Sequence, residues 1–316
     1  MINNKDNLKA IFLILAGMTV FAIQDTLIKL LSSDTNIYLI YFIRSTVGIL
    51  IIFTYLKYKK IPIIIKTHYP LLTLTRTVAF FLGFSLYYYS LTKLSLAMAV
   101  TLFFVSPFFV TIFSMIIIKE KIGMRRWIAI FVGFTGVYLV MNPGFNSFNI
   151  YSLFPVICAI CYSFTVVIQK KTSDKDTLFS QVIHIYISAI IFSIIIKSSF
   201  AMIDLDPNIV NRYPFLLINW VIPDYVNFIM LIIIGLTGVT GFFCLFGAYN
   251  IGSPASIAPF EYVMILYGIL ISWFIWGETL NLKAYFGLLL IISAGIYTFL
   301  REVYLSKKIS IDKPLR

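Results

Sequence analysis

The sequence predicts an all-α integral membrane protein with ten transmembrane helices, arranged as two inverted repeats of five helices each. Three observations predict this fold class. The chain has 316 residues, of which 60% are hydrophobic and only 12% are charged, and its mean hydropathy is +0.95. Apolar runs of about 20 residues, long enough to cross ~30 Å of hydrocarbon, recur along the whole chain. One motif also occurs twice, half a chain length apart.

The apolar runs give the order of the predicted helices. The first five runs cover residues 9–31, 36–56, 71–91, 95–118 and 126–141. The second five cover residues 150–169, 178–197, 225–249, 254–276 and 283–302. The first run follows two lysines, as a signal peptide would. It is too long for a signal sequence and contains Gln24 and Asp25, so we expect it to remain as the first transmembrane helix.

Lysine and arginine residues predict the orientation. They concentrate in loops on the side of the N-terminus, such as Lys57–Lys66 and Lys119–Arg126, and in the C-terminal tail. Cytoplasmic loops carry this excess in membrane proteins, so both termini are expected in the cytoplasm. The net charge of +12 has the same explanation. No RNA-binding module lies between the runs, and no nucleic-acid partner is expected.

A repeated motif divides the chain into two halves. Four residues recur at a fixed offset of 158, namely Ser95, Ala97, Ser114 and Glu120 as Ser253, Ala255, Ser272 and Glu278. Five spans per half is an odd number, so the second half must enter the membrane upside down. We predict a first repeat over residues 1–145 and a second over residues 146–316, which ends in a basic cytoplasmic tail. Inverted repeats are typical of secondary transporters, whose substrate site lies between the repeats.

The repeat motifs also resemble a known family. They are Tyr87–Leu91, Ser95–Ala99, Ser106–Pro107 and Gly133–Leu139 in the first half, and Ala248–Ser253, Pro259–Tyr262 and Gly277–Glu278 in the second. They resemble the EamA-type repeat of the drug/metabolite transporter superfamily. One departure is Ile265, which stands where the first half has Pro107.

The Pro-Phe-Glu-Tyr stretch is similar to a subgroup that includes the S-adenosylmethionine uptake transporters of obligate intracellular bacteria. Residue usage rich in Ile, Lys and Asn fits an AT-rich genome of that kind. The resemblance implies ten spans in a bacterial inner membrane. It also implies uptake of S-adenosylmethionine, for which exchange against S-adenosylhomocysteine would need no ion gradient.

Glu261 is the strongest candidate for substrate binding. Ionisable groups at membrane depth cost at least a few kcal/mol and therefore indicate function. Glu261 follows Pro259, which can unwind the ninth helix beside a cavity. Its carboxylate could hold a sulfonium or ammonium group, or take up and release a proton. The neighbouring Tyr262, together with Phe104 in the fourth span, is predicted to stack on a purine.

A second group of candidates lies in the first two spans. Asp25, with Gln24 beside it, can pair with Lys29 one turn further along the same helix or with Arg44 at a similar depth in the second span. The sequence leaves both pairings open, and a structural ion pair is as good an interpretation as a substrate contact. Arg76 in the third span is expected to extend toward the cytoplasmic surface.

Other polar and aromatic residues have structural interpretations. Pro107 predicts a bend in the fourth span, and Glu278 is expected to cap or brace the following helix. The run Tyr87–Tyr89 lies near a span end and is interpreted as part of an interfacial aromatic belt. His184 is expected to serve as a proton relay or a polar packing residue.

Other function classes lack their motifs. The sequence has no P-loop, no HExxH and no nucleophile–base cluster, so we predict no catalytic residue, metal or cofactor and no enzymatic activity. Cys158 and Cys161 form a CxxC inside an apolar run and are interpreted as small packing residues. The leading hypothesis is a secondary transporter that works by alternating access. The alternative is a proton-coupled exporter or importer of another amine, amino acid or vitamin-like metabolite. The expected partners are a small-molecule substrate and the lipid bilayer, with the protein a monomer or homodimer.

Overall fold

The computed structural model describes residues 4–119, 124–141, 149–203, 206–221, 224–251 and 258–312. These residues form helices joined by loops and contain no strand, which confirms the all-α prediction. The helices of the first half are α1 (Asn4–Leu31), α2 (Ile37–Tyr58), α3 (Pro70–Ser90), α4 (Leu96–Phe103), α5 (Ser106–Phe113), the π-helical turn η1 (Ser114–Ile118) and α6 (Met124–Met141).

The second half follows the same order with two added short helices. Its elements are the 3-10 turn η2 (Ile150–Ser152), α7 (Leu153–Thr172), α8 (Leu178–Ala201), α9 (Pro207–Arg212), α10 (Pro214–Leu217), α11 (Tyr225–Ile251), the 3-10 turn η3 (Ala258–Tyr262), α13 (Val263–Trp276) and α14 (Leu282–Asp312). Within the described ranges, seven helical segments are long and apolar enough to cross a membrane. Three shorter apolar helices accompany them, at Trp127–Met141, Phe260–Trp276 and Leu282–Tyr297.

Polar side chains fix where several helices begin. Asn36 precedes α2, and its side chain accepts a hydrogen bond of 2.8 Å from the backbone N–H of Tyr38. Ser95 does the same for α4 with the N–H of Met98, at 3.1 Å. Such caps satisfy backbone donors that have no partner inside the helix, a requirement that is stronger in lipid than in water.

The fourth span is interrupted near its middle. Helix α4 ends at Phe103, and α5 starts at Ser106 with Pro107 in its first turn. Because proline has no N–H to donate, the helix cannot continue through this position with all its bonds intact. The bend that Pro107 predicted is therefore present. In the second half, the 3-10 turn η3 precedes α13 in the same way.

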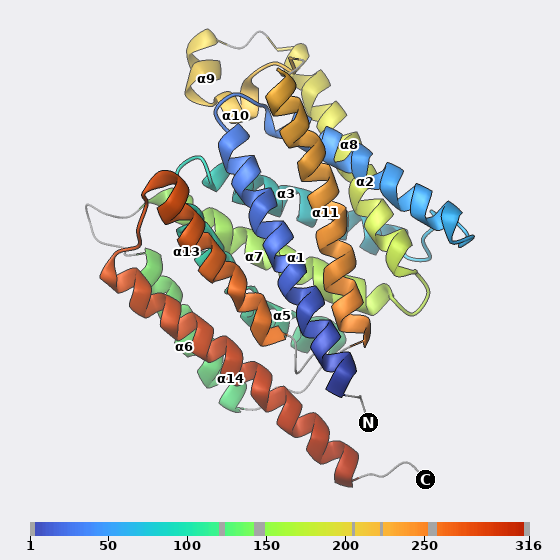
Figure 1. Ribbon diagram of the computed structural model, residues 1–316, viewed down its shortest axis with the longest axis vertical. Helices are drawn as coiled ribbons and strands as arrows, with labels where there is room; N and C mark the ends of the chain where they lie inside the picture. Colours follow the sequence, from blue (N-terminus) through green and yellow to red (C-terminus); the bar gives the residue numbers. More distant parts are fainter. Residues whose placement is uncertain are drawn as a thin grey trace.

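Helices of the two halves pack against one another. Helix α1 lies along α11, and α3 lies along α7, while α2 packs on α8 and α4 packs on α13. Helices α6 and α14 run side by side at the lower left of Figure 1. They approach closely because Gly136 faces Gly287, and a Cβ on Gly136 would lie 2.6 Å from the carbonyl oxygen of Gly287.

Two sets of hydrogen bonds join segments next to helix ends in one half to segments next to helix ends in the other. The side chain of Asn36 donates to the carbonyl of Leu216 in α10, at 2.9 Å, and to that of Ile218 just after this helix, at 2.8 Å. Asp176, just before α8, accepts from the backbone N–H of His68 at 3.0 Å and from the Thr67 hydroxyl. Burial raises the pKa of Asp176, but these hydrogen bonds outweigh it and hold the pKa below its ordinary value.

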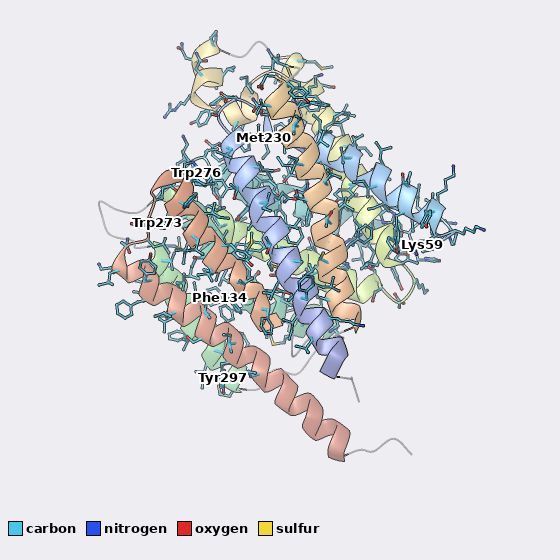
Figure 2. The ribbon with its side chains drawn as sticks, in the orientation of Figure 1. Lys59, Phe134, Met230, Trp273, Trp276 and Tyr297 are labelled. Carbon is cyan, nitrogen blue, oxygen red and sulfur yellow. The ribbon has the colours of Figure 1, made fainter. Side chains whose placement is uncertain are left out.

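The outer surface carries many exposed apolar side chains, as a lipid-facing surface would. On α13, Trp273 is 60% exposed and Phe274 is 85% exposed. Figure 2 shows Lys59 at the free tip of α2, away from the packed centre of the molecule. The start of α1 and the end of α14 lie toward the same end of the molecule, opposite α9 and α10 (Figure 1).

Cysteine labelling should report this topology. With the N-terminus in the cytoplasm, Lys59→Cys should react with a membrane-impermeant maleimide only after the membrane is permeabilised, and Asn208→Cys in α9 should react in intact cells. Both side chains are exposed, so each variant is the accessibility control for the other. Labelling of both residues from one side would contradict the predicted orientation.

Candidate substrate-binding cavity

A partly enclosed cavity lies among helices of both halves. It contains about 890 Å³ of empty space, a volume that includes the part open to the surroundings. Aromatic rings make up much of its wall, and they are Phe21, Phe80, Phe84, Tyr87, Tyr88, Phe103, Phe104, Tyr162 and Phe242. Among the described residues, the charged ones that line it are Asp25, Arg44 and Glu261. The wall therefore combines flat aromatic surfaces with charged groups of both signs.

The interrupted helices bring residues from both repeats to this wall. Phe103 and Phe104 lie where α4 ends, and Glu261 and Tyr262 lie at the end of η3. The offset of 158 relates Phe103 to Glu261 and Phe104 to Tyr262. The rings of Phe104 and Tyr262 contact each other, with centroids 5.5 Å apart. The break between α4 and α5 thus matches the change from the 3-10 turn η3 to α13, and the two positions meet at the Phe104–Tyr262 contact.

Two tyrosines hold the charged groups of the first half in place. Tyr87 donates a hydrogen bond of 2.9 Å to the Asp25 carboxylate, and Arg44 Nη1 donates one of 2.9 Å to the Tyr88 hydroxyl. The Gln24 amide also donates to Tyr88, at 3.2 Å. Asp25 is 7% exposed and Arg44 is 5% exposed. These contacts orient the buried groups without joining them to each other.

Both predicted partners of Asp25 lie beyond ion-pair distance. No ion pair within 4.0 Å joins Asp25 to Lys29 or Arg44. Lys29 instead donates to the Glu278 carboxylate at 2.8 Å and to the Leu94 carbonyl at 3.0 Å. An interhelical partner is available because the α13–α14 turn lies beside the last turn of α1.

Glu278 was expected to cap or brace the helix that follows it, and the capping part of this prediction was wrong. The cap is Asn281, whose side chain accepts from the N–H of Ala284 at 2.8 Å. Glu120, the matching residue of the first half, lies outside the described residues.

The prediction for Arg76 was also wrong. Its side chain is 1% exposed and does not reach the surface, and its Nη2 donates to the carbonyl of Gln181 at 3.1 Å. The start of α8 covers it, which hydropathy along α3 could not reveal. His184 contacts the carbonyl of Ile65 in the loop after α2 and does not line the cavity.

Five of the six predicted binding residues line the cavity. They are Glu261, Asp25, Arg44, Gln24 and Phe104. Tyr262 is not among the lining residues, since its ring packs on Phe104 and against Gly295 of α14. No group of three or more His, Cys, Asp or Glu side chains suited to a metal ion occurs in the described part of the chain.

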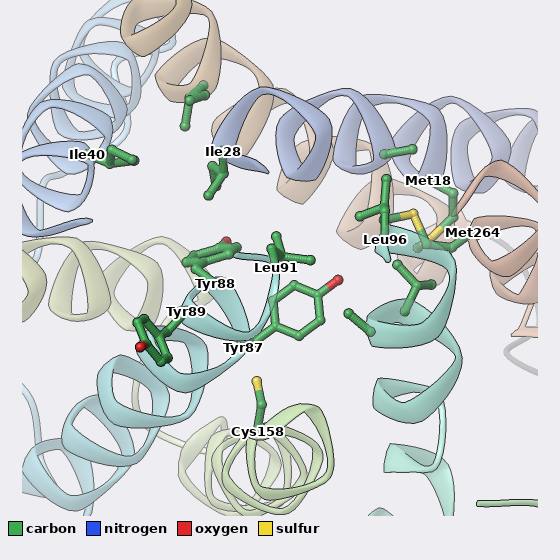
Figure 3. Close-up of a cluster of buried hydrophobic side chains, with 14 of the residues drawn as sticks. Met18, Ile28, Ile40, Tyr87, Tyr88, Tyr89, Leu91, Leu96, Cys158 and Met264 are labelled. Atoms are coloured by element: carbon green, nitrogen blue, oxygen red, sulfur yellow. The ribbon is translucent and has the colours of Figure 1, made fainter. Parts of the chain in front are cut away.

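The run Tyr87–Tyr89 was missed as part of the site. All three tyrosines are buried, at 3%, 2% and 8% exposure, so the interfacial interpretation was wrong. Figure 3 shows them leaving α3 in different directions, with Met18 and Met264 close together near Leu96. A run of three tyrosines can place two hydroxyls on charged groups of neighbouring helices while the third packs elsewhere. The feature of the sequence that could have indicated this role is the hydroxyl of each tyrosine, which needs a hydrogen-bond partner when the ring is buried.

Comparisons with known proteins place the chain in a family of transporters. A model of the EamA-like transporter family matches residues 8–142 and 149–300, which confirms the family resemblance of the repeat motifs. The S-adenosylmethionine uptake transporter of Rickettsia prowazekii is 24% identical over 298 residues, 94% of this chain and 95% of that protein. The riboflavin transporter of Vibrio cholerae is 24% identical over 237 residues, 74% of this chain and 73% of that protein. A solved structure described as "Crystal structure of protein" aligns with a TM-score of 0.61 at 13% identity, covers 95% of this chain and 99% of that one, and shows similarity of fold alone.

Proposed function

Because this chain belongs to the EamA-like transporter family, we propose that it takes up S-adenosylmethionine across the bacterial inner membrane by alternating access. S-adenosylhomocysteine is the proposed exchange partner. The observation that carries the proposal is the cavity itself, where aromatic rings surround Asp25, Arg44 and Glu261 among helices of both halves. Asp25, Arg44, Gln24, Phe104 and Glu261 are the proposed contacts, and Tyr262 acts through its packing on Phe104.

Charge complementarity supports this substrate. S-adenosylmethionine carries two cationic centres, the sulfonium and the ammonium, and one carboxylate. With both carboxylates ionised, the cavity offers two anionic groups, Asp25 and Glu261, and one cationic group, Arg44. Charges in a low-dielectric site are costly unless each has an opposite partner, so a solute with this charge pattern is favoured. Aromatic walls suit an adenine ring and a sulfonium cation alike.

The pattern of helix packing supports two inverted repeats, residues 1–145 and 146–316. In that arrangement α1 corresponds to α7, and α3 corresponds to α11. If each helix is replaced by its counterpart in the other repeat, the α1–α11 contact becomes the α7–α3 contact. Both contacts are present. The contacts α2–α8 and α6–α14 each join corresponding helices, and the α4–α13 contact joins the corresponding fourth and ninth spans. Such exchange of contacts is expected when two repeats rock about a shared site.

Riboflavin is the second candidate, because three of the relatives are riboflavin transporters and the cavity has flat aromatic walls. Its ring system would stack well but carries no charge at neutral pH. It offers no charged group to Asp25, Arg44 or Glu261, whereas S-adenosylmethionine offers a group of opposite charge to each of them, which favours S-adenosylmethionine. Proton-coupled movement of another amine, through Glu261 or Asp25, would require a pH gradient that exchange does not need.

Exchange in proteoliposomes distinguishes these candidates. Vesicles loaded with unlabelled S-adenosylmethionine or S-adenosylhomocysteine should accumulate radiolabelled S-adenosylmethionine without any ion gradient. Protein-free vesicles are the control. If riboflavin-loaded vesicles exchange labelled riboflavin and no vesicles exchange S-adenosylmethionine, the substrate is riboflavin. Uptake only under an imposed pH gradient would assign the proton-coupled alternative.

A further inference from the structure

We infer that Arg44 selects solutes by their carboxylate group, so that a compound lacking this group is rejected even when its ring and cationic centres fit. The inference rests on the proposed function and specifies which substrate group each end of the cavity recognises. It assigns Arg44 a role in specificity, whereas Glu261 recognises positive charge at the other end.

Arg44 is a buried cation with most of its donors unused by the protein. It is 5% exposed and lines the cavity, and its one hydrogen bond to a described residue uses Nη1. No carboxylate of the described residues lies within 4.0 Å of it, and Nε is buried without an acceptor there. Nε and Nη2 form one edge of the guanidinium, the edge that binds a carboxylate through two parallel hydrogen bonds.

Other polar atoms gather near this guanidinium. The Gln24 Oε1 and the hydroxyls of Tyr41 and Tyr186 are buried and have no hydrogen-bond partner among the described residues. Arg44 Nε and Gln24 Oε1 both lie beside Gly238 of α11, where an added Cβ would be 3.1 Å from each. A buried polar group without a partner costs about 1–3 kcal/mol, so a cluster of them is suited to a polar ligand.

Asp25, which lines the same cavity as Arg44, is already engaged. Asp25 accepts its hydrogen bond from Tyr87, outside ion-pair distance of Arg44. Asp25 therefore lowers the electrostatic cost of the guanidinium without occupying its bidentate edge. A solute carboxylate can bind this edge directly, which a neutral or purely cationic solute cannot do.

Ring contacts connect the two charged ends of the cavity. Tyr88, which bonds Arg44, lies 5.8 Å from Phe84 between ring centroids, and Phe84 lies 6.2 Å from Tyr162. Tyr162 lies within electrostatic range of Glu261. The guanidinium and the Glu261 carboxylate are thus joined by a series of ring contacts along the aromatic wall. A molecule with an amino-acid end and an aromatic body could place its carboxylate at Arg44 while its ring lies on this wall.

Matched inhibitors test the inference. Decarboxylated S-adenosylmethionine should inhibit exchange by the unmodified protein at least about 30-fold more weakly than S-adenosylmethionine, as loss of a charge-assisted contact implies. Arg44→Gln should bring this ratio close to one, because it weakens the binding of S-adenosylmethionine. Arg44→Lys keeps the positive charge but loses the two-donor edge of the guanidinium, so its ratio should lie between those of the unmodified protein and Arg44→Gln. Arg212→Lys, an exposed arginine outside the cavity, should keep the original ratio. An unchanged ratio in Arg44→Gln would overturn the inference.

A second readout separates this inference from the proposed function. The melting temperature of the detergent-solubilised protein is measured with methionine, tryptophan and S-adenosylhomocysteine, each beside its methyl amide. We expect a larger rise with at least one acid than with its amide, and no such difference in Arg44→Gln. Absence of S-adenosylmethionine exchange would refute the proposed function alone. Equal shifts for acid and amide in all three pairs would refute the role of Arg44 whatever the exchange assay shows.

Discussion

Replacing Glu261 with glutamine should lower S-adenosylmethionine exchange by at least about a hundredfold, because losing one partner of a buried charge contact costs roughly 2–5 kcal/mol. Glutamine has nearly the same shape, so the substitution removes the charge and leaves the packing in place. Glu261 lies on η3, at the interruption where the two halves meet, and it lines the cavity. The same change removes an acid–base group, so a proton-coupled mechanism would also lose activity.

The matched control for this prediction is Asp34→Asn. Asp34 is an exposed carboxylate after α1, and its neutralisation should leave exchange unchanged. Membrane abundance of both variants, measured by immunoblot, separates lost transport from lost protein. Exchange by Glu261→Gln at the rate of the unmodified protein would remove Glu261 from the mechanism.

Reversing the charge of either Lys29 or Glu278 should lower exchange at least about tenfold, an effect of ~1.4 kcal/mol, and reversing both together should restore most of it. Lys29 Nζ lies 2.8 Å from the Glu278 carboxylate, and the Lys29 side chain is only 9% exposed. The same ammonium lies 4.4 Å from the centre of the Trp276 ring. In a single variant, two like charges would meet in this partly buried contact and repel each other.

The position of the pair explains why transport should depend on it. Lys29 is one helical turn beyond Asp25, so the contact joins α1 to the α13–α14 turn just past the cavity. Nearby, the Ser272 hydroxyl accepts from the N–H of Ala97 at 2.9 Å and ties α13 to α4. We expect these contacts to form when the cavity is closed at this end and to break when it opens.

A double-mutant cycle with charge reversals measures how strongly transport depends on the Lys29–Glu278 ion pair. The variants are Lys29→Glu, Glu278→Lys and the double variant, with Lys93→Glu as a control at an exposed lysine on the same side. A double variant no more active than the single variants would show that the ion pair does not control opening. In an inverted repeat the counterpart of Lys29 is Lys170, in the last turn of α7, and that of Glu278 is Glu120.

Hydropathy was a good guide to the helices because lipid leaves few alternatives to a continuous apolar helix. The second run, predicted at residues 36–56, is α2 at Ile37–Tyr58. Proline chemistry located the interruption in the fourth span correctly. The same reasoning placed Glu261 beside an opened helix segment, and η3 is present there. Local rules of this kind need no knowledge of neighbouring helices.

Contacts between distant segments could not be predicted in the same way. The partner of Lys29 is 249 residues away in the sequence, and its pairing depends on how α1 lies against α13. Arg76 and Tyr88 were assigned to surfaces because each lies near a helix end, yet α8 covers the first and α2 the second. Hydropathy along one helix does not say which face a neighbour covers. An alignment of related sequences would carry that information.

Accessibility of the cavity from both sides of the membrane tests the central claim most directly. Met264 lines the cavity, so Met264→Cys is introduced into a chain whose Cys158, Cys161 and Cys244 are replaced by alanine. An impermeant maleimide should label this cysteine both in right-side-out and in inside-out vesicles, and S-adenosylmethionine should slow the labelling in each. Labelling from one side only, or labelling that S-adenosylmethionine leaves unchanged, would contradict a transport cavity with alternating access.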